Sequence, residues 1–136
     1  MSGIETRSAT KVRVLVVDDE PSICRALAIA LSRCGYETLT AQSGDGALAV
    51  LQSRHVDVLL VDFRIPDLRG DALYELAASM QPHLRHRTIF MTGDITARAQ
   101  ELIEECRCPF VRKPFDLALV TGAIAALLPR LERISA

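Results

Sequence analysis

Four apolar segments of this 136-residue chain each end in side chains that can bind a cation or transfer a group. These side chains are Asp18, Asp19 and Glu20 after the first segment, Asp62 after the second, Thr92 after the third and Lys113 after the fourth. Crowded carboxylates repel one another unless a cation joins them, and a hard dication such as Mg²⁺ suits carboxylate oxygens. The hydroxyl and the ammonium indicate an anionic group as the remaining occupant. Together these groups indicate a phosphoryl-transfer site.

Alternating strands and helices are predicted to position these side chains. The strands are expected at Val12–Val17, Tyr36–Ala41, Val58–Val61, Arg87–Met91 and Phe110–Val111. The helices are expected from Pro21 to the C-cap Gly35, and over Gly44–Ser53, Asp71–Met80, Thr96–Cys106 and Phe115–Leu128. Five strand–helix repeats joined by short loops predict an α/β fold, a doubly wound five-stranded parallel sheet in a three-layer sandwich.

The segment from Val56 to Gly70 is the centre of this prediction. Val58–Val61 is an uninterrupted apolar run, which is typical of a strand buried on both faces of a parallel sheet. Asp62 stands where this strand ends, and ligands of open parallel sheets bind at the carboxyl ends of the strands. Pro66 and Gly70 then set the geometry of the following loop.

Four motifs in this order resemble those of receiver domains of two-component signalling, the chemotaxis-type response-regulator fold. They are Val16–Glu20, Val61–Pro66 with Gly70, Thr92-Gly93, and Arg112–Phe115. The resemblance covers residues 12–129. It implies the flavodoxin-like strand order 2-1-3-4-5. Residues 1–11 are then a polar tail or linker, and residues 130–136 form a C-terminal tail.

The resemblance also implies a chemical role for the residues at the strand ends. Asp62 would accept a phosphoryl group from the phosphohistidine of a sensor histidine kinase or a histidine phosphotransfer protein. Asp18, Asp19 and Asp62, with the backbone carbonyl of Arg64, would hold Mg²⁺, and Mn²⁺ is expected to substitute. Such a domain catalyses its own phosphotransfer and slow autodephosphorylation without being a metabolic enzyme.

Further residues match the positions that stabilise and report phosphorylation in this family. Thr92 would hydrogen-bond the phosphoryl group and Lys113 would pair with it. Phe110 occupies the aromatic switch position, so that phosphorylation would reshape the face formed by the fourth helix, fifth strand and fifth helix. Arg64 and Asp94 border the expected path of attacking water, and their pairing would tune the lifetime of the phosphorylated state.

Composition narrows the class of protein. Apolar residues make up 49% of the chain and charged residues 24%, which is typical of a globular domain. A net charge of −1 without a basic block argues against a nucleic-acid partner. No apolar run approaches the ~20 residues of a membrane span, so a cytoplasmic protein with no membrane partner is expected. Its four cysteines are expected to be reduced thiols.

Two other classes of α/β protein fit the sequence less well than a receiver domain. A dinucleotide-binding domain needs glycines after the first strand, where this chain has Asp18, Asp19 and Glu20. A haloacid-dehalogenase-type phosphatase needs a second Asp two residues after the first, and Glu20 stands there. A receiver-like interaction module that works without phosphorylation stays open. It also stays open whether this is a stand-alone receiver or a receiver cut from a hybrid sensor histidine kinase. The pattern Ile89–Asp94 resembles the terminal receivers of such kinases.

The last predicted helix carries no charged residue between Leu117 and Leu128. Its inner stripe is expected to be Leu117, Val120, Ile124, Leu127 and Leu128, which leaves Leu119, Ala123 and Ala126 outside it. An uncharged outer face predicts docking on another surface, with a homodimer through this helix as one form. Such a contact should resist salt, because screening weakens charge pairs and leaves apolar contacts intact.

Overall fold

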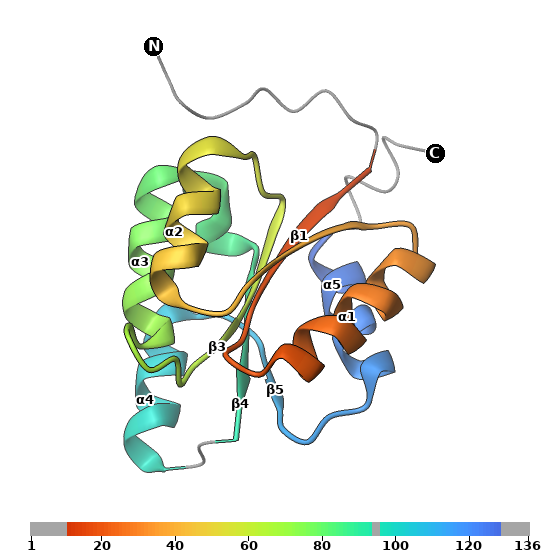
Figure 1. Cartoon of the computed structure of the whole chain (residues 1–136). Coiled ribbons are helices and arrows are strands. Elements are labelled where there is room, and N and C mark those ends of the chain that lie inside the picture. The colour runs from red at the N-terminus through yellow and green to blue at the C-terminus, as the bar shows by residue number, and fades with distance from the viewer. Residues whose placement is uncertain (1–10, 94–95, 129–136) are drawn as a thin grey trace.

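One parallel sheet organises the computed structural model, which describes residues 11–93 and 96–128 (Figure 1). Its strands lie in the order β2-β1-β3-β4-β5, and every pairing is parallel. Their bounds are β1 Arg13–Val17, β2 Glu37–Ala41, β3 Val58–Asp62, β4 Thr88–Thr92 and β5 Phe110–Arg112. The doubly wound sheet and its strand order were both predicted from the sequence, and both are confirmed.

Helices cover both faces of this sheet. Their bounds are α1 Pro21–Arg33, α2 Gly44–Ser53, α3 Gly70–Met80, α4 Ala97–Cys106 and α5 Leu117–Leu127. Figure 1 shows α1 and α5 on one face and α2, α3 and α4 on the other. The last helix starts two residues later than predicted, because the Asp116 carboxylate accepts the Ala118 N–H at 2.9 Å and caps it. A short 3₁₀ helix, η1 (Pro82–His86), was not predicted.

Strand β3 separates the two apolar cores. Alternate side chains point to opposite faces of a strand, so Val58 and Leu60 pack under α1 and α5 while Leu59 and Val61 pack under the other helices. All five residues of β3 are buried. The predicted central strand is therefore confirmed, and Asp62 is its last residue.

The inner stripe of α5 follows the prediction with one correction. Val120, Ile124 and Leu128 are buried, while Leu119 is 62% exposed. Ala123, predicted on the outer face, is half-buried and packs against the core. It lies three residues after Val120, and that spacing puts both on one side of a helix.

The loop between β3 and α3 is held by two contacts. The Gly70 N–H donates to the Phe63 carbonyl at 2.8 Å, and a Cβ on Gly70 would lie only 2.8 Å from the Asp62 carbonyl oxygen. The Asp67 carboxylate accepts the Gly44 N–H at 2.9 Å and the Asp45 N–H at 3.0 Å, at the start of α2. The loop is thus fixed both to its own strand end and to a neighbouring helix.

The predicted domain bounds depend on the two ends of the chain. The predicted lead-in, apart from Lys11, and the predicted tail lie outside the described residues, so the bounds 1–11, 12–129 and 130–136 stay predictions. None of the helices in the described part of the chain combines the length and the apolar character that a membrane span requires.

Gly70→Ala tests the close approach of the loop to β3. The added Cβ would meet backbone atoms of Asp62 and Phe63, which cannot rotate away, so we expect a loss of about 1–3 kcal/mol in the free energy of unfolding. Gly122→Ala in α5 is the matched control, because nothing lies within 4 Å of its Cβ. That helix position should gain roughly 0.5–1 kcal/mol. Equal effects of both changes in urea unfolding would contradict the packing at Gly70.

Candidate acidic active site

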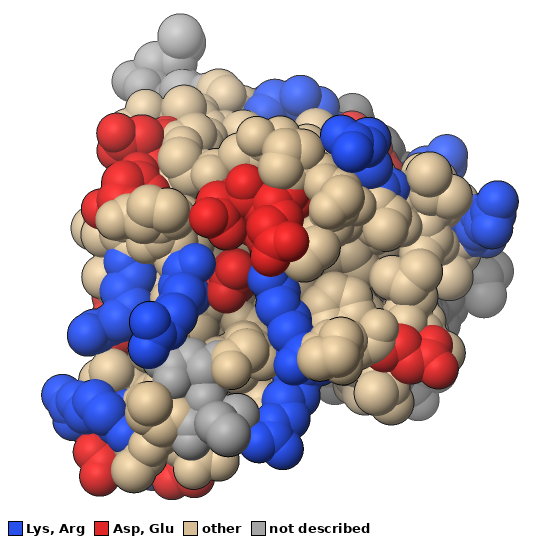
Figure 2. Space-filling view, turned by 60° about the horizontal axis from the view of Figure 1, so that its bottom comes forward, with Lys and Arg blue, Asp and Glu red and all other residues tan. Residues whose placement is uncertain are grey.

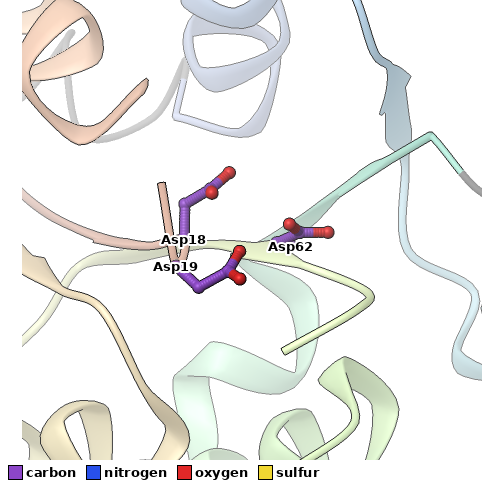
Figure 3. A group of neighbouring side chains, drawn as sticks. All are labelled: Asp18, Asp19 and Asp62. Atoms are coloured by element: carbon purple, nitrogen blue, oxygen red, sulfur yellow. The ribbon is translucent and has the colours of Figure 1, made fainter. Parts of the chain in front are cut away.

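The carboxyl ends of the strands bring the predicted side chains together at one edge of the sheet, the lower edge in Figure 1. Figure 3 shows Asp18, Asp19 and Asp62 side by side at the ends of β1 and β3. One oxygen from each of these carboxylates lies within 4.8 Å of the others. Asp18 and Asp62 are buried, whereas Asp19 is exposed. The acidic cluster that the sequence predicted is therefore present.

The ammonium of Lys113 contacts both buried carboxylates, those of Asp18 and Asp62. Its Nζ lies 2.7 Å from Asp18 Oδ2 and 2.9 Å from Asp62 Oδ2. Glu20 Oε1 is farther away, at 3.8 Å. Only 15% of the Lys113 side chain is exposed, so solvent screens these ion pairs weakly. The ammonium acts as the counterion of the carboxylates.

The peptide chain holds the second oxygen of each buried carboxylate. Asp18 Oδ1 accepts the Glu20 N–H at 2.9 Å, and Asp62 Oδ1 accepts the Arg64 N–H at 3.0 Å. Each aspartate thus bonds a backbone N–H two residues ahead, a local turn that short acidic side chains favour. The turns fix both carboxylates so that each presents Oδ2 to Lys113.

Burial and the Asp62–Lys113 contact have opposite effects on the pKa of each of these two groups. Burial raises the pKa of the Asp62 carboxyl, and the contacts with Lys113 and the Arg64 N–H offset only part of that effect. Burial also disfavours the charged form of Lys113, but its contacts with Asp18 and Asp62 outweigh this and raise the pKa of the ammonium. Lys113 therefore stays charged at neutral pH.

The donor set fits a hard dication. Asp18 Oδ2 is buried and faces the Lys113 ammonium at 2.7 Å, so a dication bound here would share this oxygen with Lys113. Three carboxylates offer oxygen ligands of the kind Mg²⁺ prefers. Because Asp19 is exposed, an ion can reach the cluster from solvent.

The other predicted residues lie at different distances from this cluster, and Phe110 is at the end of β5 away from Lys113. Thr92 ends β4 and is 2% exposed, and Phe110 begins β5 with 47% of its surface exposed. Arg64 is exposed at the rim. Asp94 lies outside the described residues, so its pairing with Arg64 stays a prediction.

Asp67 is a supporting residue that the sequence reasoning missed. It lies five positions after Asp62 but bonds the start of α2, whose Gly44 precedes it by 23 residues. An Asp in a loop gives no signal of so distant a partner. Its role is to keep the loop that carries Arg64 in place.

Three hollows open at this edge of the molecule. The central one, of about 510 Å³, is lined by Asp19, Asp62 and Lys113 among others. A second, of about 410 Å³, lies beside Lys113 and is lined by Ile23, Pro114 and Phe115. A third, of about 630 Å³, lies between the β3–α3 loop and α4. Figure 2 shows the acidic side chains gathered at this edge with basic side chains next to them.

Comparison with known proteins agrees with the fold and the acidic cluster. Residues 14–125 match the model of the response regulator receiver domain. The chain belongs to this family. Receiver domains are the parts of two-component systems that take phosphoryl groups from histidine kinases.

Individual relatives include two regulatory proteins and the receiver domain of a histidine kinase. The chain is 38% identical over 109 residues to the regulatory protein AtoC of Escherichia coli, covering 77% of this chain and 23% of that protein. It is 36% identical over 124 residues to the probable transcriptional regulator ycf27 of Cyanophora paradoxa, covering 90% and 50%. A solved receiver domain of a signal transduction histidine kinase from Syntrophus aciditrophicus superposes with a TM-score of 0.79 at 27% identity, covering 90% and 93%. The chain thus spans half or less of these two curated relatives.

Asp67 makes the scaffold of the site sensitive to acid. The two N–H groups of α2 hold the pKa of its carboxyl below the ordinary value. Such a group contributes stability that is complete above the unfolded-state pKa of about 3.9 and lost as the pH falls through the lower folded-state pKa. We expect Asp67→Asn to be less stable than the wild type at pH 7, with the difference shrinking below about pH 4. Urea unfolding between pH 3 and pH 8 checks this, and a difference that does not change with pH would contradict it.

Proposed function

We propose that Asp62 is the phosphoacceptor of this receiver domain and takes its phosphoryl group from a phosphohistidine of a sensor histidine kinase or a histidine phosphotransfer protein. The observation that carries the proposal is the contact of the Lys113 ammonium with Asp62 Oδ2 at 2.9 Å, made at the edge where Asp18 and Asp19 also lie. A carboxylate fixed beside a cation and further carboxylates is equipped to receive a phosphoryl group.

In the transfer, an Asp62 oxygen forms a bond to phosphorus while the bond from phosphorus to the donor's imidazole nitrogen breaks. The imidazole keeps the electron pair of that bond. The Arg64 N–H holds Asp62 Oδ1, so Oδ2 is the oxygen that faces the cleft. Lys113 can then pair with a phosphoryl oxygen, and the Thr92 hydroxyl can donate a hydrogen bond to another. Mg²⁺, held by Asp18, Asp19, Asp62 and the Arg64 carbonyl, would neutralise charge on the carboxylates and the phosphoryl group.

The apolar hollow beside Lys113 supports docking of the phosphodonor. Ile23 lies in α1, while Pro114 and Phe115 precede α5, so the hollow joins two elements on one face of the sheet. It shares Glu20 and Lys113 with the acidic hollow. A helix carrying phosphohistidine that seats an apolar side chain here would present its imidazole to Asp62.

The signal is proposed to leave through the face of α4, β5 and α5. Phosphorylation would draw Thr92 toward the phosphoryl group, and Phe110, now half-exposed, would follow. Arg64, paired with Asp94, would slow the attack of water on the phosphoaspartate. The similarity to the receiver domain of a histidine kinase supports the alternative that this receiver is part of a hybrid sensor histidine kinase.

Asp62→Asn tests the phosphoacceptor. With Mg²⁺ and acetyl phosphate, the wild type should gain one phosphoryl group, seen as a single mass increase in intact-protein mass spectrometry. The variant should gain none, because an amide is not a nucleophile here. Asp45→Asn is the matched control, since it removes an exposed carboxylate in the first turn of α2, and it should still be phosphorylated. Uptake by Asp62→Asn would move the site, and no uptake by the wild type would favour a module that works without phosphorylation.

Asp19→Asn tests the metal. Removing one of three carboxylates should lower Mg²⁺ affinity by roughly tenfold in calorimetric titration. The metal-free variant should also melt at a higher temperature, because one member of a repelling cluster is gone. Asp45→Asn removes an exposed carboxylate from the first turn of α2, so it should leave the Mg²⁺ affinity unchanged and should not raise the melting temperature. An unchanged Mg²⁺ affinity in Asp19→Asn would show that Asp19 is not a ligand.

Self-association through α5 is part of the proposal. Leu119 is 62% exposed on a helix without charged residues, so a contact through it should be apolar and should persist at high salt. Sedimentation of the beryllofluoride-treated protein at low and high salt is expected to show the same dimer, lost in Leu119→Glu. Ile29→Glu changes an apolar side chain on α1 that is 56% exposed, and it should leave the dimer intact. A strict monomer, or a dimer that dissociates in salt, would contradict this interface.

A further inference from the structure

The third hollow at the site edge has a basic rim and an apolar floor. We call it the arginine cleft. Its rim carries Arg64 and Arg69 from the β3–α3 loop and Arg98 from the first turn of α4, and its floor includes Phe63, Ile65 and Leu102. The three arginines are exposed, while the floor residues are 2%, 5% and 8% exposed. The cleft therefore combines accessible positive charge with a narrow strip of accessible apolar surface.

The rim arginines differ in how firmly they are held. Arg69 makes a two-pronged contact with Asp71, at 2.5 Å and 3.1 Å, and lies over the Phe63 ring, 5.9 Å from its centroid. Arg98 pairs with Glu101 at 3.2 Å, and both side chains are more than 60% exposed. An exposed pair such as Arg98–Glu101 contributes only ~0–1 kcal/mol, so an incoming carboxylate can replace Glu101, whereas at Arg69 it would share the guanidinium with Asp71. Guanidinium groups match carboxylates in a two-pronged geometry.

The distribution of the charges selects the kind of ligand. The three guanidinium groups are anchored on two separate elements, a loop and a helix, along the walls of a hollow of about 630 Å³. A compact single anion engages one or two such groups. An acidic peptide engages all of them, because its carboxylates are spaced along a chain, and it also brings an apolar side chain for the floor.

We propose that the arginine cleft binds an acidic peptide segment of a partner protein, with carboxylates on Arg64, Arg69 and Arg98 and an apolar side chain over Phe63. The cleft shares Arg64 and Thr96 with the acidic hollow, so the bound segment lies next to Asp62. It is on the side of α4, whereas the hollow proposed for the phosphodonor is on the side of α1 and α5. A peptide carboxylate on Arg64 would replace the proposed pairing of Arg64 with Asp94. The proposal depends on the cleft alone and stands whether or not Asp62 is phosphorylated.

An NMR titration of the whole ¹⁵N-labelled chain tests the cleft. The probe is the capped peptide Glu-Glu-Leu-Glu-Phe-Glu-Glu, added at low salt to protein without phosphodonor. Amide signals of residues 63–69 and 97–102 should shift. Two control peptides should bind at least about fivefold more weakly, one with Lys in place of every Glu and one with Gly in place of Leu and Phe.

Arg98→Glu should weaken binding of the acidic peptide by about fivefold. Arg33→Glu is the matched control, because it reverses an exposed arginine at the end of α1, and it should leave this affinity unchanged. Circular dichroism confirms that both variants fold. Absence of binding, equal losses in both variants, or shifts centred on Lys113 and Phe115 would overturn the proposal. So would binding of a nucleoside monophosphate at the cleft with no binding of the peptide.

Discussion

The contact of one ammonium with two buried carboxylates underlies the whole site. Asp18 is fully buried and Asp62 is 6% exposed, and two such charges in a poorly solvated place repel each other. Lys113 compensates that repulsion with ion pairs of 2.7 Å and 2.9 Å. The same arrangement explains why the site suits phosphoryl transfer. A dication can strengthen the compensation at the carboxylates, and Lys113 is then available to an incoming anionic group.

The scaffold makes this contact possible because all three residues lie at carboxyl ends of parallel strands. β1 and β5 flank β3 and β4 in the sheet, so their ends meet at one edge. Backbone N–H groups of Glu20 and Arg64 orient the two carboxylates. The loop that supplies the second N–H is itself fixed by Gly70, whose N–H donates to the Phe63 carbonyl, and by Asp67, which accepts the first two N–H groups of α2. Stability and site geometry therefore depend on the same loop.

Local patterns in the sequence were enough to predict the sheet, the strand ends and the acidic cluster. An apolar run such as Val58–Val61 has few alternatives to a central strand, and Asp62 follows it directly. Contacts across the fold were not predictable in this way. The partner of Asp67 lies 23 residues away, and nothing in the sequence around Asp67 indicates it. The arginine cleft could not be predicted either, because Arg69 and Arg98 come to line the same hollow only when the β3–α3 loop packs beside α4.

Family membership gives the chain a general role, and the two side hollows are the places where we propose that partner proteins bind. One is apolar and lies beside Lys113, and the other is rimmed by arginine on the opposite face. The account still depends on the central ion pairs. A double-mutant cycle of Lys113→Met and Asp62→Asn, measured by urea unfolding in metal-free buffer, tests them most directly. We predict that Lys113→Met is destabilising, that adding Asp62→Asn restores part of the loss, and that the coupling is about 1 kcal/mol or more. Effects that add to within ~0.3–0.5 kcal/mol would show that Lys113 does not hold the carboxylates together.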